Sequence, residues 1–184
     1  MLKFALIGAG RIGRMHGSII AGHTKTELVW VYDILEDNAI TTANTTQARV
    51  AKSLDEIFED DSLDAVLIAS STETHAELIV RAAKAGKAVF CEKPIDLDIK
   101  RLDWCREQIQ GLQVPVQIGF NRRFDPSHRK VADTARDGGI GNLEQVIITS
   151  RDPNPPPKEY YLASGGMFRD MTIHDFDMAR YVLN

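Results

Sequence analysis

Residues 1–120 alternate short apolar runs with amphipathic stretches, and this alternation constrains the fold more than any other feature of the sequence. Each run is nearly continuous in apolar residues, as strands of a parallel sheet are when helices cover both of its faces. The pattern therefore predicts an α/β fold with a doubly wound parallel sheet. The predicted strands lie at residues 3–8, 27–33, 64–70, 87–93 and 114–120, with a weaker one near Val50.

The stretches between the runs predict crossover helices. Residues 74–86, THAELIVRAAKAG, carry apolar residues at helical spacing and end at Gly86, a residue type common at helix ends. We interpret nearly all of the apolar positions as core. The composition agrees with this interpretation, because 43% hydrophobic and 26% charged residues are ordinary values for a globular protein.

The character of the chain changes after Phe120. Residues 121–141 form a polar, helix-rich connector that ends in glycines, and a predicted strand follows at residues 143–150. A proline-rich loop at residues 152–158 and a final helix complete the chain. One strand is too little to close a second sheet. We therefore assign residues 1–120 to a first domain, and residues 121–184 to a connector and the incomplete start of an α+β substrate domain.

Charge and cysteine content exclude several classes of function. A net charge of −4 gives no electrostatic reason to expect a nucleic acid or an anionic membrane as partner. No apolar stretch approaches the roughly 18 residues of a membrane helix, and the N-terminus has no signal-peptide pattern. Cys91 and Cys105 are not a closely spaced pair of the kind found in zinc or redox sites. We expect a cytoplasmic protein with reduced thiols, no metal and a small-molecule ligand.

The segment GAGRIG matches the dinucleotide-binding pattern G-x-G-x-x-G, and it lies between a predicted strand and a predicted helix, where the match carries weight. Gly8 would allow the tight turn, Gly10 would let the backbone approach a pyrophosphate, and Gly13 would let the helix pack on the strand. The helix N-terminus at Arg11 and Ile12 would offer N–H groups to the phosphates. This context predicts a Rossmann fold.

Asp33 ends the second predicted strand, about 20 residues after Gly13. A carboxylate at this place can accept hydrogen bonds from the hydroxyls of the adenosine ribose. It would also repel a 2′-phosphate, which favours NAD over NADP as the cofactor. The alternative is that Asp33 only caps the next helix.

Two further polar segments follow predicted strands. They should line the same crevice, because ligands of such sheets bind beyond the carboxyl ends of the strands. The segment SSTETH runs from Ser70 to His75, and CEKP contains Glu92 and Lys93. Lys93 lies at the end of a central strand and before a proline, which suits a ligand contact better than a solvated charge. Without further support, we give equal weight to a ligand contact and to a solvated charge as the role of Lys93.

The last predicted helix carries Asp170 and His174, four residues apart in SGGMFRDMTIHDFDMARYVLN. At that spacing both side chains would lie on one helix face. The pair alone is compatible with a catalytic role and with an ordinary amphipathic helix.

Taken together, the motifs resemble one family. GAGRIG, Asp33, STETHAE, CEKP, GFNRRFDP and the last helix occur in the order typical of Gfo/Idh/MocA oxidoreductases, over essentially the whole chain. Within that family the chain is most similar to the inositol 2-dehydrogenases, and SRDP with the proline-rich loop points to that branch. The resemblance implies an NAD-dependent dehydrogenase acting on CH–OH, which oxidises a secondary hydroxyl of a cyclic polyol to a ketone.

The resemblance also implies the catalytic residues. In such enzymes the lysine of E-K-P and the aspartate and histidine of D-x-x-x-H act together, and these are Lys93, Asp170 and His174 here. Removal of a hydride from a carbinol carbon requires that the hydroxyl proton leave as well. Histidine titrates near neutral pH and suits the role of general base, while a lysine can stabilise the oxygen as its proton departs.

Other site residues follow from the same resemblance. Ser70, Thr72 and His75 correspond to a stretch near the nicotinamide ribose, although many relatives have proline in place of Thr72. Glu92 and Lys93 are also expected to contact the cofactor. Substrate contacts are expected from Lys93, Asn121, Arg122, Asp170 and His174. An exposed basic helix start is an equally good reading of Asn121 and Arg122, and packing is a better reading of Tyr160 and Tyr161 than a polyol pocket.

Two alternatives to an inositol dehydrogenase remain at this point. The chain could be a non-catalytic NAD-binding fragment or ligand sensor, because members of the family normally continue well beyond this length. It could also be a dehydrogenase of the same family that acts on another sugar. A homo-oligomer is expected for a complete family member, but not for so short a chain.

Overall fold

The computed structural model describes residues 1–151, 154 and 164–183, and the chain divides into two units, Met1–Gly119 and Phe120–Asn184. Most of the predicted proline-rich loop at residues 152–158, as well as Tyr160 and Tyr161, lies outside the described residues. Within the described ranges, no helix is both long enough and apolar enough to cross a membrane.

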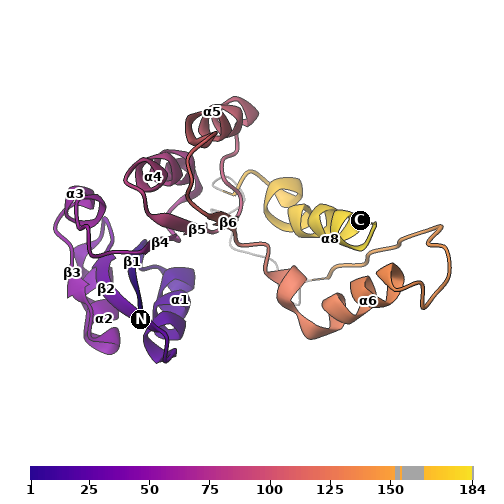
Figure 1. The fold of residues 1–184 in the computed structure, drawn as a ribbon, viewed down its shortest axis with the longest axis horizontal. Helices are drawn as coiled ribbons and strands as arrows, with labels where there is room; N and C mark the ends of the chain where they lie inside the picture. The colour runs from indigo at the N-terminus through magenta and orange to yellow at the C-terminus, as the bar shows by residue number, and fades with distance from the viewer. Residues whose placement is uncertain (152–153, 155–163, 184) are drawn as a thin grey trace. The chain divides into compact units, whose positions relative to one another are not determined.

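The first unit contains one sheet of six parallel strands in the order β3-β2-β1-β4-β5-β6 (Figure 1). This order is that of the Rossmann fold, and it confirms the predicted parallel sheet. The strands are β1 (Leu2–Ile7), β2 (Thr26–Tyr32), β3 (Arg49–Val50), β4 (Ala65–Ile68), β5 (Ala88–Cys91) and β6 (Val116–Ile118). The helices are α1 (Arg11–Gly22), α2 (Glu36–Thr46), α3 (Leu54–Phe58), α4 (Thr72–Lys84) and α5 (Ile99–Ile109).

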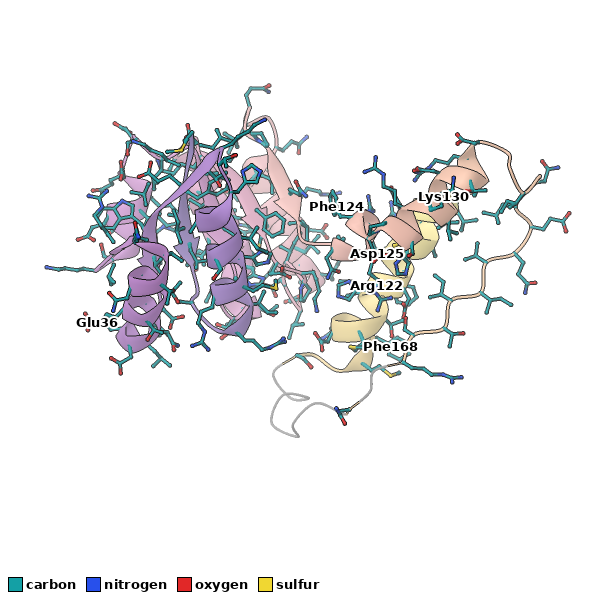
Figure 2. All side chains as sticks on the ribbon, turned by 90° about the horizontal axis from the view of Figure 1, so that it is seen from below. Glu36, Arg122, Phe124, Asp125, Lys130 and Phe168 are labelled. Atoms are coloured by element: carbon teal, nitrogen blue, oxygen red, sulfur yellow. The ribbon has the colours of Figure 1, made fainter. Side chains whose placement is uncertain are left out.

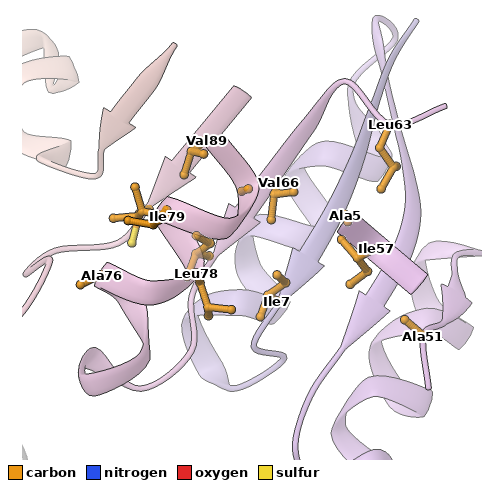
Figure 3. Close-up of a cluster of buried hydrophobic side chains, with 14 of the residues drawn as sticks. Ala5, Ile7, Ala51, Ile57, Leu63, Val66, Ala76, Leu78, Ile79 and Val89 are labelled. Carbon is orange, nitrogen blue, oxygen red and sulfur yellow. The ribbon is translucent and has the colours of Figure 1, made fainter. Parts of the chain in front are cut away.

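Successive residues of β1 belong to two different cores, because side chains alternate between the faces of a sheet. Ala5 and Ile7 pack in a cluster with residues of α3, α4 and α5, which Figure 3 shows. Leu6 packs in a second cluster with residues of α1 and α2. Helices therefore cover both faces of the sheet, which explains why its strands read as nearly continuous apolar runs.

Both cysteines are part of the first of these cores. Cys91 and Cys105 are buried and free, and burial raises the pKa of each thiol. The two side chains are therefore protonated, and they act as small apolar groups rather than as reactive thiolates.

Asp60, in the turn before β4, binds two donors from different parts of the first unit. Its carboxylate accepts a hydrogen bond from the Ser62 backbone at 2.9 Å and one from the Trp30 indole at 2.7 Å. The hydrogen bonds from Ser62 and then from Trp30 lower the pKa of Asp60 to about 2. Because the pKa in the folded state lies below the ordinary value of 3.8, Asp60 stabilises the fold above that value, and this contribution is lost as the pH falls toward 2.

We expect Asp60→Asn to lower the stability at neutral pH by about 1 kcal/mol, a small value because solvent screens this carboxylate. The variant should also lose less stability than the parent protein between pH 4 and pH 2, because it lacks the group that titrates there. Urea unfolding monitored at several pH values measures both effects. Asp61→Asn, at the exposed neighbouring residue, is the matched control. An acid transition of unchanged steepness in Asp60→Asn would contradict the assignment.

The second unit is built on two helices that pack on each other, α6 (Pro126–Arg136) and α8 (Ile173–Leu183). Their contact buries Ala132 and Met178. The short helix η1 (Asn121–Phe124) precedes α6, and the Asp125 carboxylate caps α6 by accepting hydrogen bonds from the next turn (Figure 2). Arg123 and the buried Asp177 form a two-bond ion pair between η1 and α8.

The structure corrects two sequence-based predictions in the second unit. Residues 143–150 form no strand, because a strand needs a partner for its backbone and the described part of this unit contains none. The last helix is not α-helical throughout, since Phe168–Thr172 form a π-helical segment, η2, ahead of α8. A π turn holds one residue more than an α turn, and the polar and apolar pattern did not reveal it.

Candidate functional site

The loop between β1 and α1 is packed too tightly at two of its glycines to hold side chains. Gly8 has φ +92°, and a Cβ on it would lie 2.4 Å from the Ser70 nitrogen. A Cβ on Gly13 would lie 1.8 Å from the Gly8 carbonyl oxygen. The loop after β1 therefore lies directly against the turn after β4. Those two strands are neighbours at the point where the strand order reverses, which is the ligand crevice of such sheets.

Gly10 differs from these two glycines because the space around it is open. A Cβ on Gly10 would have no heavy atom within 4 Å, and its φ of −69° is available to any residue. Gly10 is also the N-cap of α1, so the backbone N–H groups of the first helical turn, at Arg11 and Ile12, face this opening. An anionic group such as a pyrophosphate fits this arrangement, since it needs donors and close backbone approach.

Asp33 follows β2 and lies beside the glycine loop. Its Oδ2 accepts a hydrogen bond from the Ala9 backbone at 2.6 Å, and its Oδ1 accepts one from the Leu35 backbone at 2.8 Å. The carboxylate therefore holds the loop after β1 and the approach to α2 in fixed positions. An ionised carboxylate has about four acceptor sites, so these bonds leave capacity for the hydroxyls of a ribose.

Ser70 lies in the turn after β4, and Thr72 and His75 lie in the first turns of α4. The Ser70 hydroxyl is hydrogen-bonded to Thr74 at 2.7 Å, and Thr72 is the first residue of α4. His75 is buried, with Nδ1 2.7 Å from the Pro94 carbonyl oxygen and Nε2 3.0 Å from the Ser70 carbonyl oxygen. Both ring nitrogens thus face backbone oxygens, a placement that the sequence did not predict.

Glu92 and Lys93 follow β5 at the same edge of the sheet. Glu92 Oε1 lies 2.8 Å from His16 Nε2, and the His16 ring contacts Phe90 edge-on with 5.3 Å between centroids. A Cβ on Gly119, at the end of β6, would lie 3.2 Å from Glu92 Oε1. Glu92 therefore connects α1 with the ends of β5 and β6, and Lys93 is the next residue along the chain.

His16 is a site residue that the sequence analysis missed, since it was read as an ordinary surface or core histidine. A signal for it exists in the helical spacing. The buried residues of α1 are Gly13, Gly17 and Ile20, and position 16 lies on the same face of the helix. His16 is a half-buried polar residue on the helix face that meets the sheet, one turn after the glycine loop. A side chain in this position is a candidate partner for a charged residue that follows a strand, such as Glu92 after β5.

The second unit contains the other predicted site residues. Asn121 is exposed at the start of η1. Arg122 donates to the Asp175 carboxylate at 2.5 Å and to the Ser150 hydroxyl at 3.1 Å, so its guanidinium is part of a hydrogen-bonded cluster within the unit. The sequence analysis did not single out Ser150 or Asp175, because nothing in their local pattern indicates a shared partner so far along the chain.

Asp170 and His174, four residues apart in sequence, lie in two consecutive helical segments. Asp170 lies in the π-helical segment η2, and its backbone nitrogen donates to the Gly166 carbonyl at 3.1 Å. His174 is the second residue of α8, and its ring contacts the edge of Phe120 with 6.4 Å between centroids. Such π turns are found frequently at functional sites, which favours a role for this segment beyond packing.

Within the described ranges, no group of three His, Cys, Asp and Glu side chains is placed to hold a metal ion. At the carboxyl edge of its sheet, the first unit brings together the open space around Gly10, the Asp33 carboxylate and the turn with Lys93. This set can bind a dinucleotide and place a cation beside it. The second unit offers an acid and an imidazole on one helical segment.

Comparison with known protein families gives two matches that together cover nearly the whole chain. Residues 2–120 match the Gfo/Idh/MocA model, described as an oxidoreductase family with an NAD-binding Rossmann fold. Residues 128–184 match the model of the Gfo/Idh/MocA C-terminal domain.

Individual relatives agree with these matches. An inositol 2-dehydrogenase of Rhizobium meliloti is 48% identical over 182 residues, which are 99% of this chain and 55% of the relative. The crystal structure of a myo-inositol dehydrogenase from Corynebacterium glutamicum superposes with a TM-score of 0.94 at 48% identity, over 99% of this chain and 55% of that one. A scyllo-inositol dehydrogenase from Lactobacillus casei, solved with bound NAD(H) and scyllo-inositol, gives 0.84 at 31% identity, over 99% and 56%. The chain spans about half the length of these relatives.

Proposed function

Because the chain belongs to the Gfo/Idh/MocA family of oxidoreductases, we propose that it serves in the NAD-dependent oxidation of a secondary hydroxyl of a cyclic polyol to a ketone. One observation carries the proposal. Lys93 lies two residues after β5, at the carboxyl edge of the sheet where the glycine loop also lies, in a chain whose relatives are named inositol dehydrogenases. A polyol of the inositol type is therefore the proposed substrate.

The glycine loop and Asp33 would hold the cofactor. The opening over Gly10 admits a pyrophosphate to the backbone N–H groups at the start of α1, and the Asp33 carboxylate would accept hydrogen bonds from the adenosine ribose. The same carboxylate repels a 2′-phosphate, which is the reason to propose NAD and not NADP. Bound NAD supplies the acceptor for the hydride that leaves the carbinol carbon.

Three side chains would act on the reacting hydroxyl. A ring nitrogen of His174 takes the hydroxyl proton as the carbonyl forms, because an imidazole is a competent base near neutral pH. The Lys93 ammonium donates a hydrogen bond to the same oxygen and stabilises the negative charge that develops on it. Asp170 orients the polyol or the imidazole by accepting a hydrogen bond.

The experiment combines NAD titration by calorimetry with an assay of polyol-dependent NADH formation, both on this 184-residue chain. If the chain is catalytic, Lys93→Met and His174→Gln should each lower turnover by about 100-fold or more, since they remove an oxyanion donor and a general base. His128→Gln, at an exposed histidine beside Asp125, is the matched control and should leave turnover unchanged. A panel of myo-inositol, scyllo-inositol and other sugars distinguishes the inositol branch from another sugar dehydrogenase.

A second candidate function is NAD binding without turnover, and the observation in its favour is that the glycine loop, Asp33 and the whole parallel sheet lie within the first unit. NAD binding with no NADH formation from any polyol supports this candidate and overturns catalysis by this chain. Absence of NAD binding overturns both candidates.

A further inference from the structure

His75 is a fully enclosed polar side chain to which the proposed reaction gives no task. It lies in the first turns of α4 and is 2% exposed. Its Nδ1 is 2.7 Å from the Pro94 carbonyl oxygen, and its Nε2 is 3.0 Å from the Ser70 carbonyl oxygen. Both ring nitrogens therefore contact backbone carbonyl oxygens of the protein itself. The ring has no polar atom left for a ligand, and its role must be sought in the two segments that it joins.

Those two segments are the turns that follow β4 and β5. Ser70 lies two residues after β4, in the turn that also packs against Gly8, and Pro94 lies three residues after β5. Pro94 is bonded directly to Lys93 and is itself buried. A proline has no backbone N–H, so its carbonyl oxygen is the only backbone group by which Pro94 can be held through a hydrogen bond. His75 supplies that hydrogen bond.

We infer that His75 is a positioning residue, which fixes the backbone next to Lys93 through the Pro94 carbonyl and sets where the Lys93 ammonium is presented. The inference rests on the proposed function for the task of Lys93, but the hydrogen bond itself does not depend on it. A carbonyl oxygen can only accept a hydrogen bond, so the bond to Pro94 is donated by the N–H at Nδ1 of the ring. The shorter contact, to Pro94, is the one that we assign to this role.

Two amide substitutions separate the two contacts. The side-chain nitrogen of Asn can occupy nearly the position of Nδ1, so His75→Asn keeps a donor for Pro94. The side-chain nitrogen of Gln reaches nearly the position of Nε2, so His75→Gln keeps a donor for Ser70 alone. His75→Leu fills the site without any donor. Thr74→Val is a control on the same helix, because it breaks the Ser70–Thr74 bond and leaves the Pro94 contact in place.

The first measurement is hydrogen–deuterium exchange of the peptide spanning residues 92–97, which needs no ligand. His75→Gln and His75→Leu should exchange about tenfold faster there than the parent protein, the effect of one lost hydrogen bond. His75→Asn and Thr74→Val should stay within about threefold. Equal acceleration in His75→Asn and His75→Gln, in step with their melting temperatures, would overturn the inference in favour of a general packing role.

The second measurement is the affinity for NAD, and the turnover of a polyol where the chain shows it. His75→Gln should lose affinity or turnover about tenfold, and His75→Asn should restore most of it. Unchanged binding and turnover in His75→Gln, despite faster exchange, would show that the Pro94 bond does not serve Lys93. Should the parent protein bind no NAD, the proposed function fails, while the exchange experiment still decides whether His75 holds the turn.

Discussion

Gly13→Ala is expected to destabilise the first unit by about 3 kcal/mol, the upper range for forcing extra atoms into a packed site. The added methyl would lie 1.8 Å from the Gly8 carbonyl oxygen, which is backbone and cannot rotate away as a flexible side chain could. The loop after β1 would have to separate from α1, and Gly8 in turn packs on the turn after β4. Thermal unfolding followed by circular dichroism should show a decrease of about 10 °C.

Gly22→Ala is the matched control for Gly13→Ala. Both glycines lie in α1, but a Cβ on Gly22 meets no heavy atom within 4 Å. Alanine has a higher helix propensity than glycine, so Gly22→Ala should leave the melting temperature unchanged or raise it slightly. If Gly13→Ala and Gly22→Ala have the same melting temperature, the loop after β1 is not a close-packed junction.

Gly10→Ala is expected to weaken NAD binding about 100-fold while the fold survives. A Cβ at this position meets nothing in the protein, and Gly10 has an ordinary φ of −69°. The methyl would instead occupy the space through which a pyrophosphate approaches the helix N-terminus. Loss of one or two hydrogen bonds to a charged group, about 3 kcal/mol in total, corresponds to that factor in the dissociation constant.

Calorimetric titration with NAD measures the affinity of Gly10→Ala, and thermal unfolding measures its stability. The stability should fall by less than about 1 kcal/mol, since glycine is only a moderately better N-cap than alanine. Gly13→Ala and Gly10→Ala thus test different properties of one loop, because the first should lower the stability of the fold and the second mainly the affinity for NAD. NAD affinity unchanged by Gly10→Ala would contradict the placement of the pyrophosphate.

The sequence was sufficient to predict the elements of the first unit because each of them has a recognisable pattern within its own residues. Strands buried on both faces read as apolar runs, and the end of α4 is marked by Gly86, two residues after Lys84, with φ +73°. The glycine loop was equally readable, since a backbone without room for Cβ atoms demands glycine at fixed positions. Where one residue type is enforced by local geometry, a single sequence is informative.

The second unit was harder to predict because its structure depends on partners far along the chain. Residues 143–150 have a strand-like pattern, but a strand also needs a neighbour, and periodicity cannot supply one. The π turn around Asp170 follows from one extra residue in a helix, which leaves the polar pattern almost unchanged. The bonds of Arg122 to Ser150 and Asp175 likewise join residues that no spacing rule connects.

The same distinction applies to the candidate site in the first unit. Glycines, Asp33 and Lys93 could be chosen because each lies beside a recognisable strand end. The contacts of His16 with Glu92 and of His75 with Pro94 could not be predicted from the sequence, because these residues meet only once the sheet is assembled. Polar contacts between elements are set by the tertiary fold, and they are the contacts that orient the residues found from motifs.

The place of β1 in the middle of the sheet has a consequence for the order of folding. β1 pairs on one side with β2 and on the other with β4, and the backbone N–H of Lys3 donates to the Asp64 carboxylate 61 positions away. During synthesis the first strand must therefore wait for β4 before its second edge is covered, and pairings of such long sequence separation form slowly. The Gly8 loop meets the Ser70 turn only after that event. A nascent chain would thus be able to bind NAD only after β1 and β4 have paired.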